Sequence, residues 1–140
     1  MAETFSFKLL TPTGIVFDGN VEEVSAVGPL GEFGVLAEHI NFITSLVPGV
    51  LEAQLPGGAE MHWIVAGGLC EVKDGVMTVL ANSAEAPDNV DRGAAIAEAQ
   101  AAEQKFSATS FFDPSYPAVN EALQLARARL DATNLKSATH

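Results

Sequence analysis

Four side chains in this sequence carry the groups that most often act as nucleophiles, proton carriers or metal ligands: His39, His62, Cys70 and His140. The histidines form no His-x-His or His-x-x-x-His pair, so the ligand set of a cupin-type metal barrel is missing. No serine stands in a nucleophile-elbow setting, and no spacing indicates an acid–base pair. The sequence therefore predicts no catalytic residue, no metal site and no cofactor, and it argues against an autonomous enzyme.

These four residues have simpler structural interpretations. Cys70 is predicted to be a small core residue, and a single cysteine, which cannot form an internal disulfide, fits a reducing compartment. His62 is predicted at the surface or edge of a strand. His39 is predicted to be structural, and His140 is the last residue. None of these interpretations assigns a reaction to the chain.

The segment Gly28–His39 reads Gly-Pro-Leu-Gly-Glu-Phe-Gly-Val-Leu-Ala-Glu-His, with a glycine at every third position of its first part. No helix start follows these glycines and no Gly-Lys-Ser/Thr ending is present, unlike in dinucleotide and phosphate-binding loops. Glycines of this kind let a backbone turn tightly, adopt positive φ or approach a neighbouring chain. We interpret the segment as architecture that carries an interaction surface.

The composition predicts a globular protein with an acidic surface. Of 140 residues 48% are hydrophobic, and the net charge is −11. Such a surface repels phosphate backbones and anionic headgroups, so we expect neither nucleic acid nor direct lipid binding. No apolar run approaches the roughly 20 residues that cross a bilayer, and the first residues lack the features of a secretion signal. We expect a cytosolic protein.

Period-two alternation of apolar residues predicts strands up to about Ala84. The alternation is clear at Phe5–Leu9 and Met61–Val65 and poor over residues 21–27. Short strands at this spacing predict an N-terminal antiparallel β-sandwich or flattened barrel, which we assign to residues 1–86.

Turn residues set the expected strand ends. Asp74-Gly75 is a strong hairpin signal because both residues tolerate positive φ. Further turns are predicted at Asp18-Gly19, Pro48-Gly49 and Pro56-Gly57-Gly58. The Asp74-Gly75 hairpin would pair Val72 with Met77, Cys70 with Val79, Leu69 with Leu80 and Glu71 with Thr78.

Residues 87–140 are predicted to form a C-terminal antiparallel two-helix hairpin. Alanine-rich residues 90–106 predict the first helix, and the second should begin between Pro114 and Pro117. Capping candidates for the first helix are Asp88, Asn89 and Asp91. The expected apolar stripe of the second helix is Val119, Ala122, Leu123, Ala126 and Leu130.

The stability of this hairpin leaves two alternatives open. Alanine pairs bury little area, and isolated helices of this length are marginal. The hairpin is therefore either a low-stability element that detaches from the sheet or a fixed helical cap on it. Its basic end, with Arg127, Arg129 and Lys136, is a candidate contact for an acidic partner.

Four segments in order resemble the epsilon subunit of bacterial F-type ATP synthases. They are Gly28–His39, Leu46–Leu51, Ala66–Val72 and Thr78–Glu85, followed by the two-helix tail. The resemblance is close over about residues 5–92 and holds in type and length for the hairpin. It implies a non-catalytic rotor subunit whose sandwich joins the gamma subunit and sits on the c ring, at the cytoplasmic face of the bacterial inner membrane.

The resemblance also implies partner contacts. Glu32 and His39 match family positions near the polar loops of the c ring. In this family the hairpin either folds on the sandwich or extends into the alpha/beta catalytic head and inhibits ATP hydrolysis. Arg127, Arg129 and Lys136 are the matching basic candidates for that head. The isolated chain is expected to be a monomer.

Two departures from the family pattern matter. Asn41 stands where many members have proline. Members that bind ATP carry Ile/Leu-Asp-x-x-Arg-Ala at the first helix, whereas this chain has Asp91 and Ala95 with Ala94 at the arginine position. We therefore expect weak or no nucleotide binding. The alternative functions are a free-standing adaptor and a ligand-binding β-barrel with a helical lid.

Overall fold

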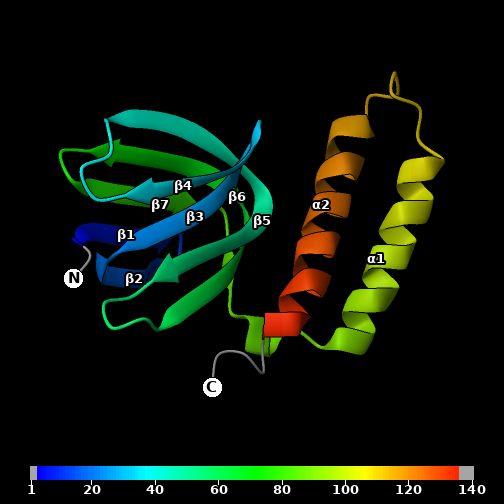
Figure 1. Ribbon diagram of the computed structural model, residues 1–140. Helices are drawn as coiled ribbons and strands as arrows, with labels where there is room; N and C mark the ends of the chain where they lie inside the picture. Colours follow the sequence, from blue (N-terminus) through cyan, green and yellow to red (C-terminus); the bar gives the residue numbers. More distant parts are fainter. Residues whose placement is uncertain (1–2, 136–140) are drawn as a thin grey trace.

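The computed structural model describes residues 3–135 and consists of a β-sandwich followed by two helices (Figure 1). The sheet has eight strands in the order β2-β1-β7-β6-β5-β3-β4, and β8 pairs with β6. Long, curved strands β5 and β6 run through both layers of the sandwich. The strands are β1 (Phe5–Thr11), β2 (Gly14–Val21), β3 (Glu23–Gly28), β4 (Gly31–Leu36), β5 (Phe42–Gln54), β6 (Glu60–Lys73), β7 (Val76–Ala81) and β8 (Ala84–Glu85).

The core of the sandwich is formed by the inward residues of alternating strands, as the period-two pattern predicts. Phe7 and Leu9 of β1 and Cys70 of β6 have no solvent exposure. The rings of Phe7, Phe17 and Trp63 pack against one another in tilted arrangements. All four residue pairs predicted for the Asp74-Gly75 hairpin are present in the β6–β7 register. A local turn signal between two alternating segments was therefore sufficient to fix this part of the sheet.

Two predicted turns are wrong. Asp18-Gly19 lies inside β2, where the two residues pair with Lys8 and Phe7 of β1, and the turn before β2 is Pro12-Thr13. An Asp-Gly pair makes a hairpin turn only when its flanking segments pair with each other. Here the residues on both sides of Asp18-Gly19 pair with the preceding strand β1 instead.

Pro48-Gly49, the second wrong turn, lies inside β5. Regular pairing with β6 is interrupted between Leu46 and Pro48, opposite Gly67. Gly67 has a φ of 98°, and an irregular ladder position of this kind accepts a proline that cannot donate a backbone hydrogen bond. The strand bends at this point and continues.

One strand pair departs from the expected antiparallel arrangement, because β1 and β7 are parallel, with Phe7 opposite Met77. The segment over residues 21–27, whose alternation was poor, forms the end of β2 and most of β3. The remaining predicted turn, Pro56-Gly57-Gly58, connects β5 to β6 as expected.

The C-terminal part contains a short 3₁₀ turn η1 (Pro87–Asn89), helix α1 (Arg92–Ser107), helix α2 (Tyr116–Ala132) and a second 3₁₀ turn η2 (Thr133–Leu135). Of the three capping candidates, Asp91 is the one that caps α1, since its carboxylate accepts a hydrogen bond from the backbone N–H of Ala94 at 2.8 Å. No helix within residues 3–135 is long and apolar enough to cross a bilayer.

Helix α2 lies between the sandwich and α1 (Figure 1). The predicted stripe is correct for Val119, Leu123 and Ala126, but Ala122 is exposed, Leu130 is only half-buried, and Ala128 and Ala132 are buried. Helix α2 packs against both the sandwich and α1, so it buries two faces. A prediction of one apolar stripe describes only one of these faces.

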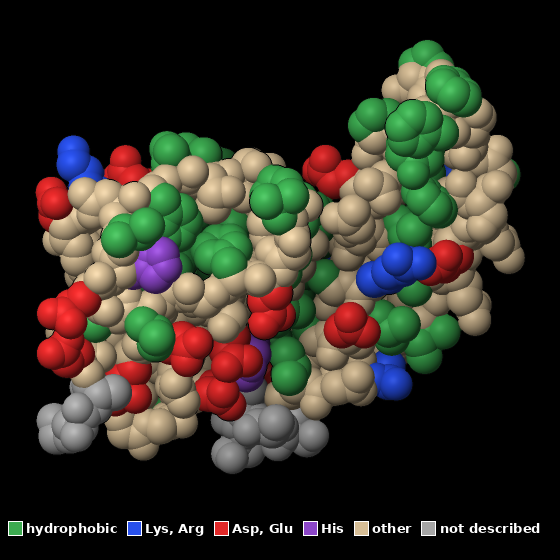
Figure 2. Space-filling model, turned by 45° about the horizontal axis from the view of Figure 1, so that its top comes forward, with side chains coloured by type: hydrophobic (Ala, Val, Ile, Leu, Met, Phe, Trp, Pro, Cys, Tyr) green, Lys and Arg blue, Asp and Glu red, His purple; other side chains and the backbone are tan. Residues whose placement is uncertain are grey.

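The hairpin docks on the sheet through a small apolar cluster near the C-terminal end of α2. Ile64 of β6 meets Ala128 and Ala132 of α2 there, with Val90 and Ala95 completing the buried part. Nearer the start of α2, a groove separates the helix from the sandwich (Figure 2). The apolar contact that holds the hairpin down is therefore limited and largely made by alanine.

Candidate functional site

The end of the sandwich formed by the β3–β4 turn and the segment before β5 carries a concave apolar surface, which we call the end patch. Leu30 and Ile40 are 103% and 76% exposed. Figure 2 shows hydrophobic side chains gathered around a histidine on the sandwich. The residues of the end patch are Gly28, Pro29, Leu30, Gly31, Glu32, Phe33, Gly34, His39, Ile40, Phe42 and Thr44.

Local backbone geometry shapes the end patch. Gly28 and Gly31 face each other at the end of the β3–β4 ladder, and Gly31 adopts a φ of 119°, which a residue with a side chain rarely does. The intervening Pro29-Leu30 turn projects Leu30 into solvent. Of the roles that the sequence allowed for these glycines, a tight turn and a positive φ are both present, and the turn presents an apolar tip.

Glu32 and His39, the two contact candidates for the c ring, both line the end patch. The His39 ring packs against Phe42 with 5.1 Å between ring centroids, and its Nδ1 lies 3.1 Å from the carbonyl oxygen of Ile40. Glu32 belongs to β4 and is exposed. The structure therefore brings together one acidic side chain, one histidine and several exposed apolar groups on a single surface.

Arg129, a contact candidate for the catalytic head, joins three elements. Its Nε and Nη2 donate to the two carboxylate oxygens of Glu85 on β8, both at 3.1 Å. Its Nη1 donates to Glu98 on α1 at 2.9 and 2.7 Å. These carboxylates, Glu85 first, raise the pKa of the guanidinium. Arg129 is therefore an internal clamp between the sandwich and both helices in this conformation.

The other two basic candidates differ from Arg129. Arg127 pairs with Glu103 across the two helices through Nε and Nη2, and both side chains are about half exposed. Lys136 lies outside the described residues. Sequence reasoning missed the acidic partners because Glu85, Glu98 and Glu103 come from distant segments, and no local pattern links them to the arginines.

The residues near the position of the family ATP motif are engaged within the chain. The Asp91 carboxylate caps α1. Arg92 donates from Nη1 to Thr133 Oγ1 at 2.7 Å and to Asn134 Oδ1 at 2.9 Å. The contacts of Arg92 connect the start of α1 to η2, the turn that follows α2, so both side chains have structural roles here.

The sequence predicts His62 at the surface or edge of a strand, but the structure places its side chain largely out of solvent. Its side chain is only 6% exposed, and Nε2 lies 3.1 Å from the Glu52 carboxylate on β5. The same face of the sheet is covered by the C-terminal part of α2, whose Ala128 lines a groove with His62. An alternating strand next to a turn gives no indication that a helix from the far end of the chain will cover it.

Cys70 is the core residue that the sequence predicted. It has no solvent exposure, and burial raises the pKa of the thiol to about 11. A buried, protonated thiol is a poor nucleophile. Cys70 therefore serves in packing of the core.

Comparison with known proteins gives matches over most of the chain. Residues 4–87 match the family described as ATP synthase, Delta/Epsilon chain, beta-sandwich domain. The ATP synthase epsilon chain of Geotalea uraniireducens is 38% identical over 130 residues, covering 93% of this chain and 94% of the relative. That of a Bradyrhizobium strain is 39% identical over 104 residues, covering 74% and 76%.

A solved structure agrees in fold. A chain of the Euglena gracilis mitochondrial ATP synthase assembly of OSCP, F1 and c-ring superposes with a TM-score of 0.78 at 23% identity, covering 98% of this chain and 82% of that chain. The likeness includes the helical hairpin as well as the sandwich. With the motif order, the sandwich and these relatives in agreement, the chain belongs to the ATP synthase delta/epsilon family.

Proposed function

We propose that the chain is a non-catalytic central-stalk subunit of a proton-translocating ATP synthase. In this role it couples rotation of the c ring to the alpha/beta catalytic head through the gamma subunit. It would lie peripherally on the cytoplasmic face of the bacterial inner membrane and be monomeric when isolated. Family membership and the near full-length likeness to epsilon chains support this role.

The end patch is the main observation behind this proposal. A contiguous group of exposed apolar side chains on a protein surface usually marks a site where a partner binds. Leu30 and Ile40 would pack on the c ring, while Glu32 and His39 would contact its polar loops. The patch combines exposed apolar side chains with one acidic side chain and one histidine, and protein interfaces likewise combine apolar and polar groups.

A substitution in the end patch tests the c-ring contact. Ile40→Glu should weaken binding to ATP synthase that lacks this subunit by about tenfold or more, because a charge would be buried in an apolar contact. ATP-driven proton pumping in vesicles should fall with it. Ile15→Glu is the matched control, since Ile15 is 69% exposed on β2, outside the patch. Equal effects of both variants would contradict the assignment.

We further propose two functional parts, a rotor-binding sandwich over residues 1–86 and a regulatory hairpin over residues 87–140. Extension of the hairpin would break the clamp of Arg129 on Glu85 and Glu98 and free Arg127 from Glu103. Acidic groups of the catalytic head could then take over both guanidinium groups. The limited alanine contact between α2 and the sheet keeps the cost of detachment low.

ATP hydrolysis by a catalytic head lacking this subunit tests the regulatory role. Full-length chain should suppress turnover, whereas residues 1–86 should bind without suppressing it. If both forms bind and have the same effect, the hairpin is a structural cap. Failure of both forms to bind a cognate head would overturn the central-stalk role itself.

We also propose that nucleotide binding is weak or absent, since Asp91 and Arg92 are engaged within the chain and Ala94 replaces the family arginine. Calorimetric titration of the isolated chain with ATP checks this. Millimolar or tighter affinity would overturn it.

A further inference from the structure

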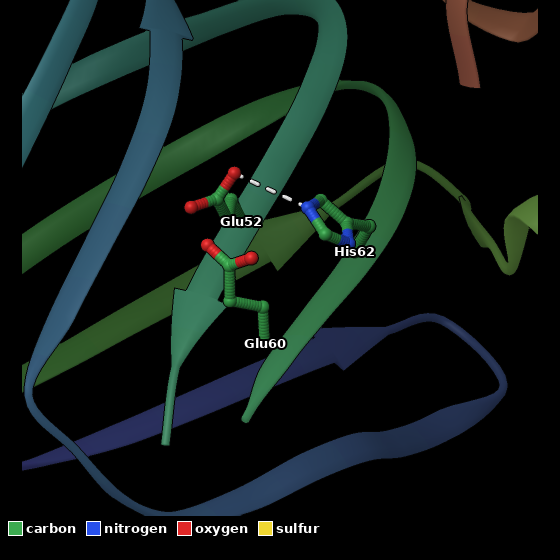
Figure 3. Close-up of side chains that lie close together, drawn as sticks. All are labelled: Glu52, Glu60 and His62. Atoms are coloured by element: carbon green, nitrogen blue, oxygen red, sulfur yellow. Dashed lines mark hydrogen bonds and ion pairs between the residues drawn. The ribbon is translucent and has the colours of Figure 1, made fainter. Parts of the chain in front are cut away.

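Three potential metal ligands lie together on the face of the β5–β6 pair that α2 partly covers (Figure 3). His62 of β6 is directly opposite Glu52 of β5, and Glu60 lies two residues before His62 on the same side of its strand. One ligand atom from each residue lies within 4.8 Å of the other two. The strand register alone therefore brings two carboxylates and an imidazole to one point.

The imidazole is held in place and points at the carboxylate pair. Its side chain is 6% exposed, and Nε2 is 3.1 Å from Glu52 Oε2. The buried Nδ1 has no hydrogen-bond partner among residues 3–135. The aliphatic side chains of Val50 and Leu135 line the same groove as the imidazole.

The carboxylates of Glu52 and Glu60 carry like charges and repel each other, and among residues 3–135 neither is paired with a lysine or an arginine. The Glu52 side chain is 42% exposed, and one of its carboxylate oxygens lies within 4.8 Å of a carboxylate oxygen of Glu60. Glu32 and Asp131 line the same groove and add negative potential around it, whereas Arg127 at its edge is already paired with Glu103. A bound cation would remove this repulsion, and the open side of the groove gives it access.

We propose that Glu52, Glu60 and His62 bind a divalent metal ion of the zinc class. One imidazole nitrogen and two carboxylate oxygens form a three-residue ligand set that zinc accepts, with water at the fourth position. Zinc–ligand distances of about 2.0–2.2 Å require ligand atoms closer together than they lie now. Glu60 is exposed and can make this movement by changing its rotamer. None of the three ligands belongs to the end patch, although Glu32 lines both surfaces.

Zinc binding to the full-length chain tests the site, with a chromophoric chelator as competitor and Co²⁺ as the spectroscopic probe. One equivalent should bind, and Glu60→Gln and His62→Gln should each weaken binding tenfold or more. Glu60→Gln keeps the test valid if His62→Gln fails to fold, because Glu60 is exposed. His39→Gln is the matched control, since His39 lines the end patch, and it should bind zinc like the unaltered chain.

Four results would overturn the proposal. The unaltered chain could bind no zinc, or Glu60→Gln could bind zinc as tightly as the unaltered chain. A hundredfold excess of Mg²⁺ could also displace zinc, which would indicate a pair of carboxylates without the imidazole, since magnesium prefers oxygen ligands. The Co²⁺ complex should show the visible absorption of a four- or five-coordinate ion, and an octahedral spectrum would likewise count against the site.

Discussion

At the scale of single residues, Gly68 shows how one position can control the sandwich. It lies at the irregular part of β6 with a φ of 150°, and a Cβ atom there would stand 2.2 Å from the backbone oxygen of Leu80 on β7. The atom in the way belongs to a paired strand and cannot rotate aside. Gly68 is therefore required by close backbone approach as well as by conformation.

We expect Gly68→Ala to lower the free energy of unfolding by about 2–4 kcal/mol, through steric overlap and backbone strain. Gly14→Ala is the matched control, because Gly14 also has a positive φ, of 138°, but nothing lies within 4 Å of its Cβ position. Urea unfolding, monitored by tryptophan fluorescence, measures the free energy of unfolding of both variants. Equal losses in the two variants would mean that conformation alone, and not contact with β7, sets the cost.

The Cys70 thiol should resist modification in the folded chain. Its pKa of about 11 leaves little thiolate at pH 8, and the sulfur is buried. Reaction with an aromatic disulfide reagent should be at least about a hundredfold slower in buffer than in denaturant, because it must wait for opening of the core. Rapid labelling of folded protein at pH 8 would contradict the burial of this side chain.

At the scale of elements, the hairpin is held on the sandwich by few apolar groups and by a network of ion pairs. Arg129 forms ion pairs with both β8 and α1, whereas the ion pair of Arg127 is with Glu103 of α1. The ion pairs of Arg129 cross the boundary between sandwich and hairpin, whereas the ion pair of Arg127 lies within the hairpin. The two arginines therefore affect different interfaces although they are two residues apart.

Arg129→Gln should weaken docking of the hairpin by about 1–2 kcal/mol, since the Arg129 side chain is mostly shielded from water and makes charge-assisted bonds to two carboxylates. Amide hydrogen exchange in α1 and α2 should become roughly five- to thirtyfold faster while exchange in the sandwich stays unchanged. The control Arg127→Gln removes a more exposed pair and should have a smaller effect. A uniform increase across the sandwich would instead indicate global destabilisation.

At the scale of the whole molecule, the two parts depend on each other unequally. The large core lies entirely within the sandwich strands, and the smaller cluster combines residues of β6, α1 and α2. The sandwich can thus bury its core alone, but the helices need Ile64 and its neighbours on the sheet. Helices of 16 and 17 residues are marginal by themselves in water.

We expect residues 1–86 to unfold cooperatively as an isolated fragment and residues 87–135 to be mostly unstructured as one. Circular dichroism and thermal melts of the two fragments measure this. Mixing them should restore little helix at micromolar concentration, because the contact between them is small. A stable, helical fragment 87–135 would show that the hairpin folds independently of the sheet.

The sequence by itself determined the features that depend on neighbouring residues. Alternation defined the strands of the core, and Asp74-Gly75 fixed the β6–β7 register. The alanine-rich segment predicted the first helix, with Asp91 as one of three capping candidates. Order and spacing of the glycine-rich motifs also identified the family. These features follow from local dihedral preferences and from side-chain periods, which act over a few residues.

The tertiary structure alone decided the features that join distant segments. Only the fold showed that β1 runs parallel to β7, that Asp18-Gly19 and Pro48-Gly49 continue strands, and that α2 covers His62. The same holds for the ion pairs of Arg129 and for the grouping of Glu52, Glu60 and His62. Each depends on which surfaces pack together across long sequence separations, and the free energy of that packing overrides local turn and strand preferences.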